Sequence, residues 1–301
     1  MDKDTLLGSI YCILGALLFS TKAVLVKLCY QYDAEPIKIL LLRMLVAAPI
    51  YLIILALSKR KEGQSKFVSK DGVFVLFLGL IGYYLASLFD FQGLKYIAAS
   101  LERVILFLYP TLVLIITSVV FKEKIEKNHI IAILISYIGV SIAYIFDGNS
   151  SDHTHLMKGA ILIFMSALTY ASYLVGSQWL IPKLGTVRFT AMAMVVSCLS
   201  VIIHYLLTAG VTLPIYQREV LQLGVLMGIF STVVPSFLIS AGIHKLGATK
   251  TAILSGVGPV STIVLSVIFL GEVFHLNQVV GTLLVLAGVI YISVSKSKPR
   301  V

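Results

Sequence analysis

The chain has 301 residues, of which 58% are hydrophobic and only 13% are charged. Soluble globular domains have about 45–50% apolar and about 25% charged residues, and the mean hydropathy of +0.99 comes from strongly apolar side chains. This composition excludes a soluble protein folded around one core, and it predicts that lipid surrounds most of the chain.

Ten apolar runs, separated by short loops, lie along the chain. A helix needs about 20 residues to cross ~30 Å of hydrocarbon, and the runs are continuous, unlike the alternating strands of a membrane barrel. We therefore predict an all-α integral membrane protein with ten transmembrane helices. The expected helices cover residues 6–29, 36–57, 72–91, 97–121, 129–146, 157–180, 187–208, 220–241, 251–271 and 276–295.

The loop charges predict how the chain is oriented. The first four residues, Met1-Asp2-Lys3-Asp4, lack the basic region and cleavage site of a signal peptide, so the first helix is expected to be retained. With the N-terminus inside, sixteen basic loop residues lie on the inner side and five on the outer side. We expect a multi-pass protein of the inner or plasma membrane with both termini in the cytoplasm. The net charge of +10 then reflects topology and not nucleic-acid binding.

An internal repeat relates the two halves of the chain. A shift of 149 residues superimposes residues 79–140 on 228–289 without a gap. Each half, 1–148 and 149–301, contains five expected helices, and this odd number makes the second half cross the membrane in the opposite direction. Inverted repeats of this kind are typical of secondary transporters. The matched pairs include Gly79 and Gly228, Gly93 and Gly242, Ala99 and Ala248, Pro110 and Pro259, Glu123 and Glu272, and Asn128 and Asn277.

Several of these stretches resemble the EamA-type members of the drug/metabolite transporter superfamily. The resemblance covers nearly the whole chain. It implies two inverted five-helix repeats around a central cavity, lined mainly by the first, third, fourth, sixth, eighth and ninth helices. It also implies export of amino acids or other small metabolites, without indicating which one. The stretches that carry it are Gly93–Ser100 with Tyr109-Pro110, Gly242 with Gly258-Pro259, Phe121-Lys122-Glu123, and Phe269–Glu272.

Four charged residues are expected to share one layer of the membrane. Charges in hydrocarbon are costly and mark candidate functional residues. At ~1.5 Å per helical residue, all four fall roughly 8–11 Å below the outer surface. The repeat places Tyr173, Ala193, Thr251 and Ala252 at the equivalent positions, so the fold does not require these charges. The four residues are Lys22, Arg43, Glu102 and Arg103.

We predict a substrate site in this layer. The three cations would hold a carboxylate or phosphate, and Glu102 would orient them or receive an amine or a proton. A structural role stays open, because long basic side chains can extend to the interface or pair with Glu102 or Asp90. Asp90 itself is expected to be a solvated carboxylate at the outer end of the third helix.

Three tyrosines complete the predicted substrate site. Tyr83 lies in mid-helix, where a hydroxyl facing lipid would lack a partner. Tyr173 shares a helix face with Tyr170, and Tyr109 directly precedes Pro110.

Two pairs of repeat-related residues are assigned conformational or structural roles. Pro110 and Pro259 are predicted to kink their helices and to act as hinges in alternating access. Glu123 and Glu272 are expected to be turn and cap residues.

The sequence thus predicts a secondary transporter of a small metabolite. We expect export of an amino acid or related carboxylate through a central cavity by alternating access. No catalytic or nucleotide-binding motif is found, so we expect no enzyme activity, cofactor or metal. The expected partners are the solute and the lipid bilayer. A coupling proton or ion and the oligomeric state stay open. The alternatives are an integral-membrane enzyme acting on a lipid-type substrate and a non-transporting sensor with the same fold.

Overall fold

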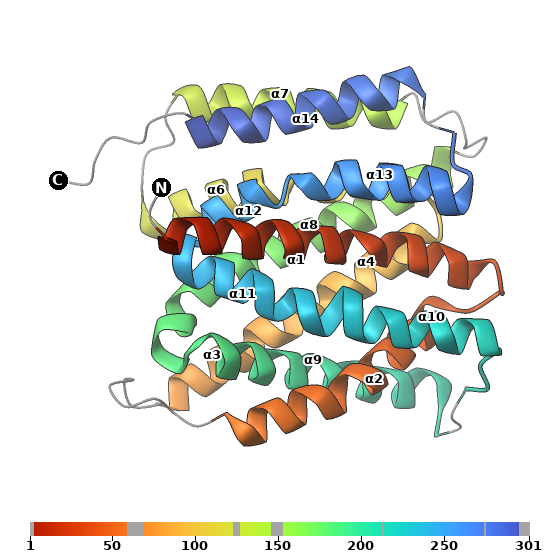
Figure 1. Ribbon diagram of the computed structural model, residues 1–301. Coiled ribbons are helices and arrows are strands. Elements are labelled where there is room, and N and C mark those ends of the chain that lie inside the picture. The colour runs from red at the N-terminus through yellow and green to blue at the C-terminus, as the bar shows by residue number, and fades with distance from the viewer. Residues whose placement is uncertain are drawn as a thin grey trace.

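The computed structural model describes residues 3–58, 69–122, 127–145, 153–211, 214–273 and 275–294, and this part of the chain is helical without strands (Figure 1). Six of the ten expected membrane helices are continuous. They are α1 (Lys3–Tyr30), α2 (Pro36–Leu57), α7 (Lys127–Ile145), α8 (His153–Leu184), α9 (Thr186–Ala209) and α14 (Leu276–Val294).

The other four expected helices are divided. The third and the eighth contain a π-helical segment, and the fourth and the ninth are broken by a turn. Their parts are α3 (Ser69–Gly79), η1 (Leu80–Leu85) and α4 (Ala86–Leu94); α5 (Ala99–Leu106) and α6 (Tyr109–Phe121); α10 (Arg218–Gly228), η2 (Ile229–Val233) and α11 (Val234–Leu246); and α12 (Ala248–Leu254) and α13 (Val257–Leu270).

Length and composition make eight of the described segments able to cross a membrane, and two apolar stretches, 133–144 and 276–291, are shorter. Large apolar side chains such as Leu52, Leu134 and Leu283 are more than half exposed on the outside of the bundle. Such a surface suits lipid and not water. The predicted fold class is confirmed.

The π-helical segments occur at equivalent positions in the two halves of the chain. The π-helical segments start at Leu80 and Ile229, which are 149 residues apart, the same shift that relates the sequences. A π turn inserts one extra residue into a helical turn and re-aims the side chains beyond it. Its recurrence at equivalent positions shows that it belongs to the repeated unit.

The prolines do more than kink their helices. Pro110 is the second residue of α6 and Pro259 the third residue of α13, and in each case the preceding helix ends before the proline's helix begins. Proline lacks the backbone N–H that an interior position needs, but it fits the first turn, where that N–H has no partner. Both spans are therefore pairs of half-helices, where the sequence predicted kinked continuous ones.

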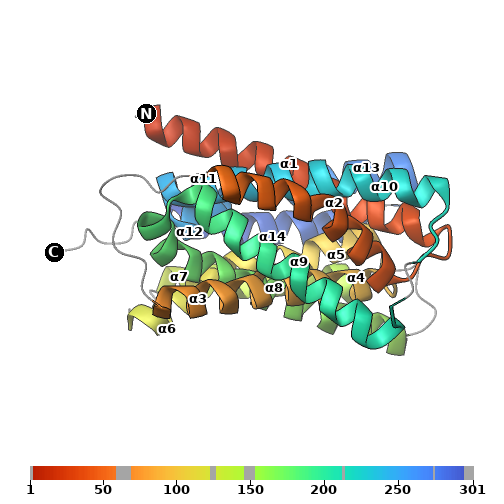
Figure 2. The same ribbon diagram turned by 90° about the horizontal axis from the view of Figure 1, so that it is seen from below.

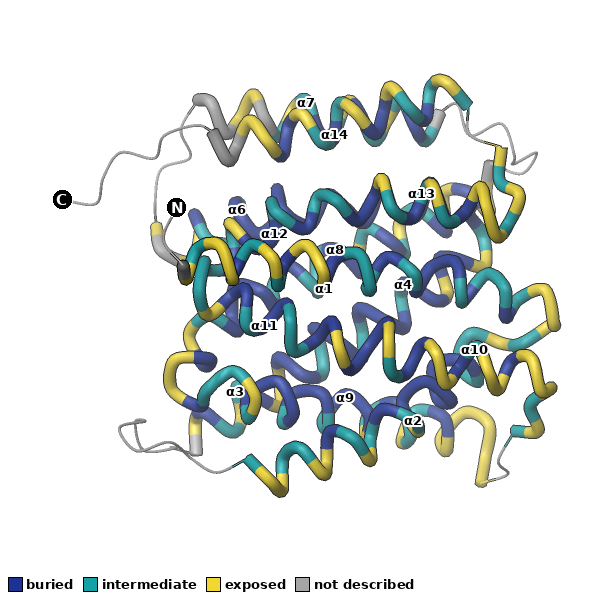
Figure 3. Tube along the Cα trace, in the orientation of Figure 1, coloured by how far each residue is buried: buried dark blue, intermediate teal, exposed yellow. Residues whose placement is uncertain are grey.

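The helices pack in an arrangement that leaves α7 and α14 at one edge (Figure 1; Figure 2 gives the view from below). These two helices pack along each other, while α1 packs against α11 and α13, α2 against α9, and α4 against α8. Buried residues concentrate on the facing sides of the central helices (Figure 3). The start of α1 and the end of α14 lie at the same end of the bundle, as an even number of crossings requires (Figure 1).

Close packing of α7 on α14 depends on glycine. A Cβ added to Gly139 would lie 2.6 Å from the carbonyl oxygen of Gly281. Backbone atoms cannot yield as a flexible side chain can, so the two helix axes would have to separate.

We expect Gly139→Val to destabilise the protein by about 1–3 kcal/mol, the usual cost of overpacking. The measurement is thermal unfolding of the purified protein in detergent. Ser141→Val on the same helix is the control, because Ser141 is exposed on the outer face. Equal melting temperatures for the two variants would contradict the close contact.

Candidate functional site

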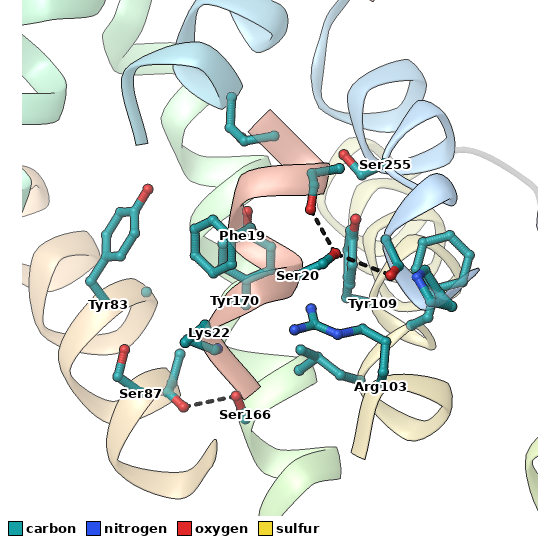
Figure 4. Close-up of a pocket in the computed structure, with 18 residues that line it drawn as sticks. Phe19, Ser20, Lys22, Tyr83, Ser87, Arg103, Tyr109, Ser166, Tyr170 and Ser255 are labelled. Carbon is teal, nitrogen blue, oxygen red and sulfur yellow. Dashed lines mark hydrogen bonds between the residues drawn. The ribbon is translucent and has the colours of Figure 1, made fainter. Parts of the chain in front are cut away.

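A cavity lies between the two halves of the chain (Figure 4), with about 630 Å³ of space not filled by protein atoms, open solvent included. Its walls come from α1, η1, α4, α5, α6, α8, α11 and α13. The polar residues on the wall are Ser20, Lys22, Tyr83, Ser87, Arg103, Tyr109, Ser166, Tyr170 and Ser255.

Four of the seven predicted substrate residues line this cavity: Lys22, Tyr83, Arg103 and Tyr109. The remaining three, Arg43, Glu102 and Tyr173, are fully buried behind the wall. Pro259 also reaches the cavity, so one of the two predicted hinges adjoins it. The assignment of the seven residues to substrate binding, and of Pro110 and Pro259 to hinge motion, remains a prediction.

Lys22 forms a buried ion pair. Its Nζ atom lies 2.6 Å from Oδ2 of Asp90 on α4, and it also lies over the ring of Phe19 at 5.2 Å. Asp90 has no exposed surface. The expectation of a solvated interfacial carboxylate is therefore wrong, because the helix continues past Asp90 to Leu94 and packs against α8.

Arg103 and Glu102 are neighbours on α5 and form a looser pair. The distance from Arg103 Nε to Glu102 Oε2 is 3.6 Å. Neither the Nε nor the Nη2 atom of Arg103 has a hydrogen-bond partner among the described residues, although both are buried. The guanidinium group points into the cavity (Figure 4). Arginine therefore offers free, desolvated donors to whatever occupies this space.

Arg43 reaches the cavity only through another residue. Its Nη2 atom donates a hydrogen bond of 2.7 Å to Ser87 Oγ, and its guanidinium lies over the Phe91 ring at 4.9 Å. Of the three predicted cations, only Lys22 and Arg103 line the cavity, and the shared depth of the four charges in the membrane remains a prediction.

Aromatic rings form much of the remaining wall. Tyr83 and Tyr173 meet edge to face at 4.8 Å between ring centroids, and Tyr109 and Tyr170 do so at 5.3 Å. The predicted site did not include Tyr170. The sequence could have indicated it, because Tyr170 is three residues from Tyr173 and shares its helix face. Phe19 completes this group on α1.

The wall serines were missed entirely. Ser20 donates to the carbonyl oxygens of Ala16 and Gly258 at 2.7 and 3.0 Å, and Ser166 donates to that of Ala86 at 2.7 Å (Figure 4). A lone serine in an apolar helix satisfies its hydroxyl on the backbone. Nothing in the sequence distinguishes it from the many others.

Glu272 holds the helix that carries the Arg103–Glu102 pair. Its carboxylate accepts hydrogen bonds from the backbone N–H groups of Ala99 and Ser100, at 2.7 and 3.0 Å. These are unpaired donors in the first turn of α5, where negative charge is favoured. The cap role expected for Glu272 is confirmed, and it acts on a helix of the other half. Glu123 and the side chain of Asn128 lie outside the described residues.

Comparison with known proteins identifies the family to which this chain belongs. The sequence profile of the EamA-like transporter family matches residues 6–145 and again residues 157–294. The chain belongs to the EamA-like transporter family. The two matches coincide with the two groups of five helices described above.

Relatives in this family are named as transporters. The chain is 30% identical over 289 residues to "Uncharacterized transporter YcbK" of Bacillus subtilis (strain 168), covering 93% of this chain and 90% of that one. It is 27% identical to an "Uncharacterized transporter" of Archaeoglobus fulgidus, covering 87% and 90%. A solved structure described as "Crystal structure of protein" has the same fold, with a TM-score of 0.68, 14% identity, and 95% and 96% coverage. The protein is a multi-pass membrane transporter.

Removing the Glu272 carboxylate should loosen α5. We expect Glu272→Ala to cost about 1 kcal/mol of stability, which is typical of a lost helix cap. Glu219→Ala is the control, since Glu219 is exposed in the first turn of α10. Hydrogen exchange should become faster at the start of α5 in the first variant only. Unchanged exchange there would argue against the cap.

Breaking the Lys22–Asp90 pair should be more damaging than removing it. Asp90→Leu leaves a buried ammonium unpaired, and we expect a loss of about 3–5 kcal/mol. The double variant Lys22→Met/Asp90→Leu removes both charges of the pair, so its melting temperature should lie well above that of the single variant. Additive losses in the double variant would show that the pair is not coupled.

Proposed function

We propose that this protein exports a small carboxylate-bearing metabolite of amino-acid size, and that Arg103 binds the carboxylate. The strongest support is the buried guanidinium group of Arg103 on the cavity wall. Its Nε and Nη2 atoms have no hydrogen-bond acceptor among the described residues. A buried donor without a partner is costly. A carboxylate would match it with two parallel hydrogen bonds.

The aromatic wall supports a solute with an apolar part. Phe19, Tyr83, Tyr109 and Tyr170 surround the space in front of Arg103. Their rings can stack on a planar or branched apolar group. A carboxylate joined to an apolar group of a few carbons fits this combination. Aromatic and aliphatic amino acids and their keto or hydroxy acids belong to this class.

The paired irregularities support alternating access in the inner or plasma membrane. In this proposal the halves 1–148 and 149–301 exchange conformations, so that the cavity opens first to one side and then to the other. Pro110 and Pro259 mark the breaks about which the half-helices α5 and α12 change their angle. Both termini lie in the cytoplasm, as the loop charges suggest.

Arg103→Gln should weaken carboxylate binding by about tenfold or more, since a charged hydrogen bond is worth about 1.5–3 kcal/mol. The measurement is a thermal-shift titration of the purified protein with phenylacetate, L-phenylalanine, glucose 6-phosphate and tetraethylammonium. Arg218→Gln is the matched control, because Arg218 is exposed at the start of α10.

Carboxylates should stabilise the wild type and the control but not Arg103→Gln. Flux of the ligands that bind is then measured in proteoliposomes of known orientation. Stabilisation by the cation alone, or equal stabilisation of all three proteins by a carboxylate, would overturn the assignment of Arg103.

A further inference from the structure

The buried charges at and behind the cavity wall do not cancel. This charged cluster contains three cations and two carboxyl groups, and the exposed surface of each residue is below a tenth of its maximum. The cations are Lys22, Arg43 and Arg103, and the carboxyl groups belong to Asp90 and Glu102. With both carboxyl groups ionised, the charged cluster has a net charge of +1.

The contacts within the charged cluster leave this excess unmatched. Lys22 Nζ lies 2.6 Å from Asp90 Oδ2, and the charge of Arg43 attracts the same carboxylate. Glu102 lies 3.6 Å from Arg103 Nε and is also close enough to Asp90 for a hydrogen bond between the two carboxyl groups. Such a bond needs a proton on one of them, which makes the net charge +2. In either state the charged cluster is positive, and an anion in the cavity offsets the buried excess.

The cavity wall presents only the positive part of the charged cluster. Lys22 and Arg103 line the cavity, whereas Asp90 and Glu102 lie behind the wall, and none of the described residues on the wall is acidic (Figure 4). An ammonium group in the cavity would therefore meet two cations and no carboxylate on the wall. Leaving a charge desolvated and unpaired is one of the means by which a site discriminates against a solute.

The aromatic wall does not replace the missing carboxylate. An aromatic ring can hold a cation over its face, but Lys22 Nζ already lies 5.2 Å from the centre of the Phe19 ring. Tyr170 stacks on Tyr173 at 6.3 Å and meets Tyr109 edge to face at 5.3 Å. These rings pack mainly on one another, and they suit the apolar part of a solute better than an ammonium group.

The wall serines offer oxygen atoms that can accept a hydrogen bond. Ser20, Ser166 and Ser255 donate their own hydrogen atoms to backbone carbonyl oxygens, at 2.7, 2.7 and 2.8 Å. A hydroxyl oxygen that donates in this way keeps its capacity as an acceptor. A neutral acceptor suits the hydroxyl group of a solute, whereas it does not offset the positive charge of an ammonium group.

From this arrangement we propose that the net positive charge of the charged cluster makes the cavity prefer carboxylates without an ammonium group, such as 2-hydroxy acids, over the amino acids of the same shape. The inference rests on the proposed function and narrows its substrate class. An anionic solute brings the negative charge that the charged cluster lacks. A zwitterion brings none, and its ammonium group would stay unpaired beside Lys22 and Arg103.

The test compares L-3-phenyllactate with L-phenylalanine, because these two solutes differ only in a hydroxyl or an ammonium group at the same carbon. Phenylacetate has neither group and serves as the reference. Each ligand is titrated into the purified protein in detergent at neutral pH. We expect phenyllactate and phenylacetate to bind about tenfold or more tightly than phenylalanine, since an unpaired buried charge is costly.

Arg43→Gln tests whether the net charge sets this preference. Arg43 lies behind the wall, so the substitution removes a positive charge without changing the lining of the cavity. We expect phenyllactate to bind several-fold more weakly and phenylalanine to change less, which narrows the ratio of the two affinities. Arg218→Gln, at an exposed residue, should keep the ratio of the wild type. The comparison of ligands on the wild type needs no variant and tests the proposal even where Arg43→Gln does not fold.

The outcomes separate the two proposals. Phenylalanine that binds as tightly as phenyllactate, or more tightly, would overturn the preference and leave the proposed function intact. An unchanged ratio of affinities in a folded Arg43→Gln protein would overturn the role of the net charge in the same way. Failure of phenylacetate, phenyllactate and phenylalanine to bind the wild type would overturn the proposed function, and the inference with it.

Discussion

Charges buried in a low-dielectric interior dominate this structure. Lys22, Asp90, Glu102 and Arg103 come from three helices, and the exposed surface of each is below a tenth of its maximum. Such groups are stable in a hydrocarbon environment only when a neighbouring helix supplies a residue of opposite charge. The positions of α1, α4 and α5 relative to one another are therefore tied to these ion pairs, and the cavity lies where the pairing is least complete.

Helix irregularity gives the cavity its shape. The π-helical segments and the turns ahead of Pro110 and Pro259 divide four spans, and each irregularity has its partner in the other half. A regular helix would present one continuous stripe to its neighbours. The breaks separate α5 and α12 from the helices that follow them, and Glu272 accepts hydrogen bonds from the first turn of α5.

The two halves have equivalent helices but different side chains at the equivalent positions. Tyr173 stands in the second half where Lys22 stands in the first, and Thr251 and Ala252 replace Glu102 and Arg103. The charged residues on the cavity wall, Lys22 and Arg103, therefore both come from the first half, whereas the second half contributes Ser166, Tyr170 and Ser255. Such asymmetry permits a polar end and an apolar end of one solute to be recognised in a single orientation.

The sequence by itself determined the fold class, because hydropathy is a local property: twenty apolar residues span a bilayer whatever they pack against. The repeat was readable for a similar reason, since Gly, Pro and Glu at matching positions need no structure to be compared. The prediction that Lys22, Glu102 and Arg103 share a layer of the membrane came from counting residues along each helix. Which of these charges face one another did not, since rotation and tilt are set by packing between helices distant in the chain. Only the tertiary structure paired Lys22 with Asp90, placed Arg43 and Tyr173 behind the wall, and brought Ser20, Ser87 and Ser166 onto it. Each of those outcomes depends on contacts between side chains far apart in sequence, and no pattern within one helix records them.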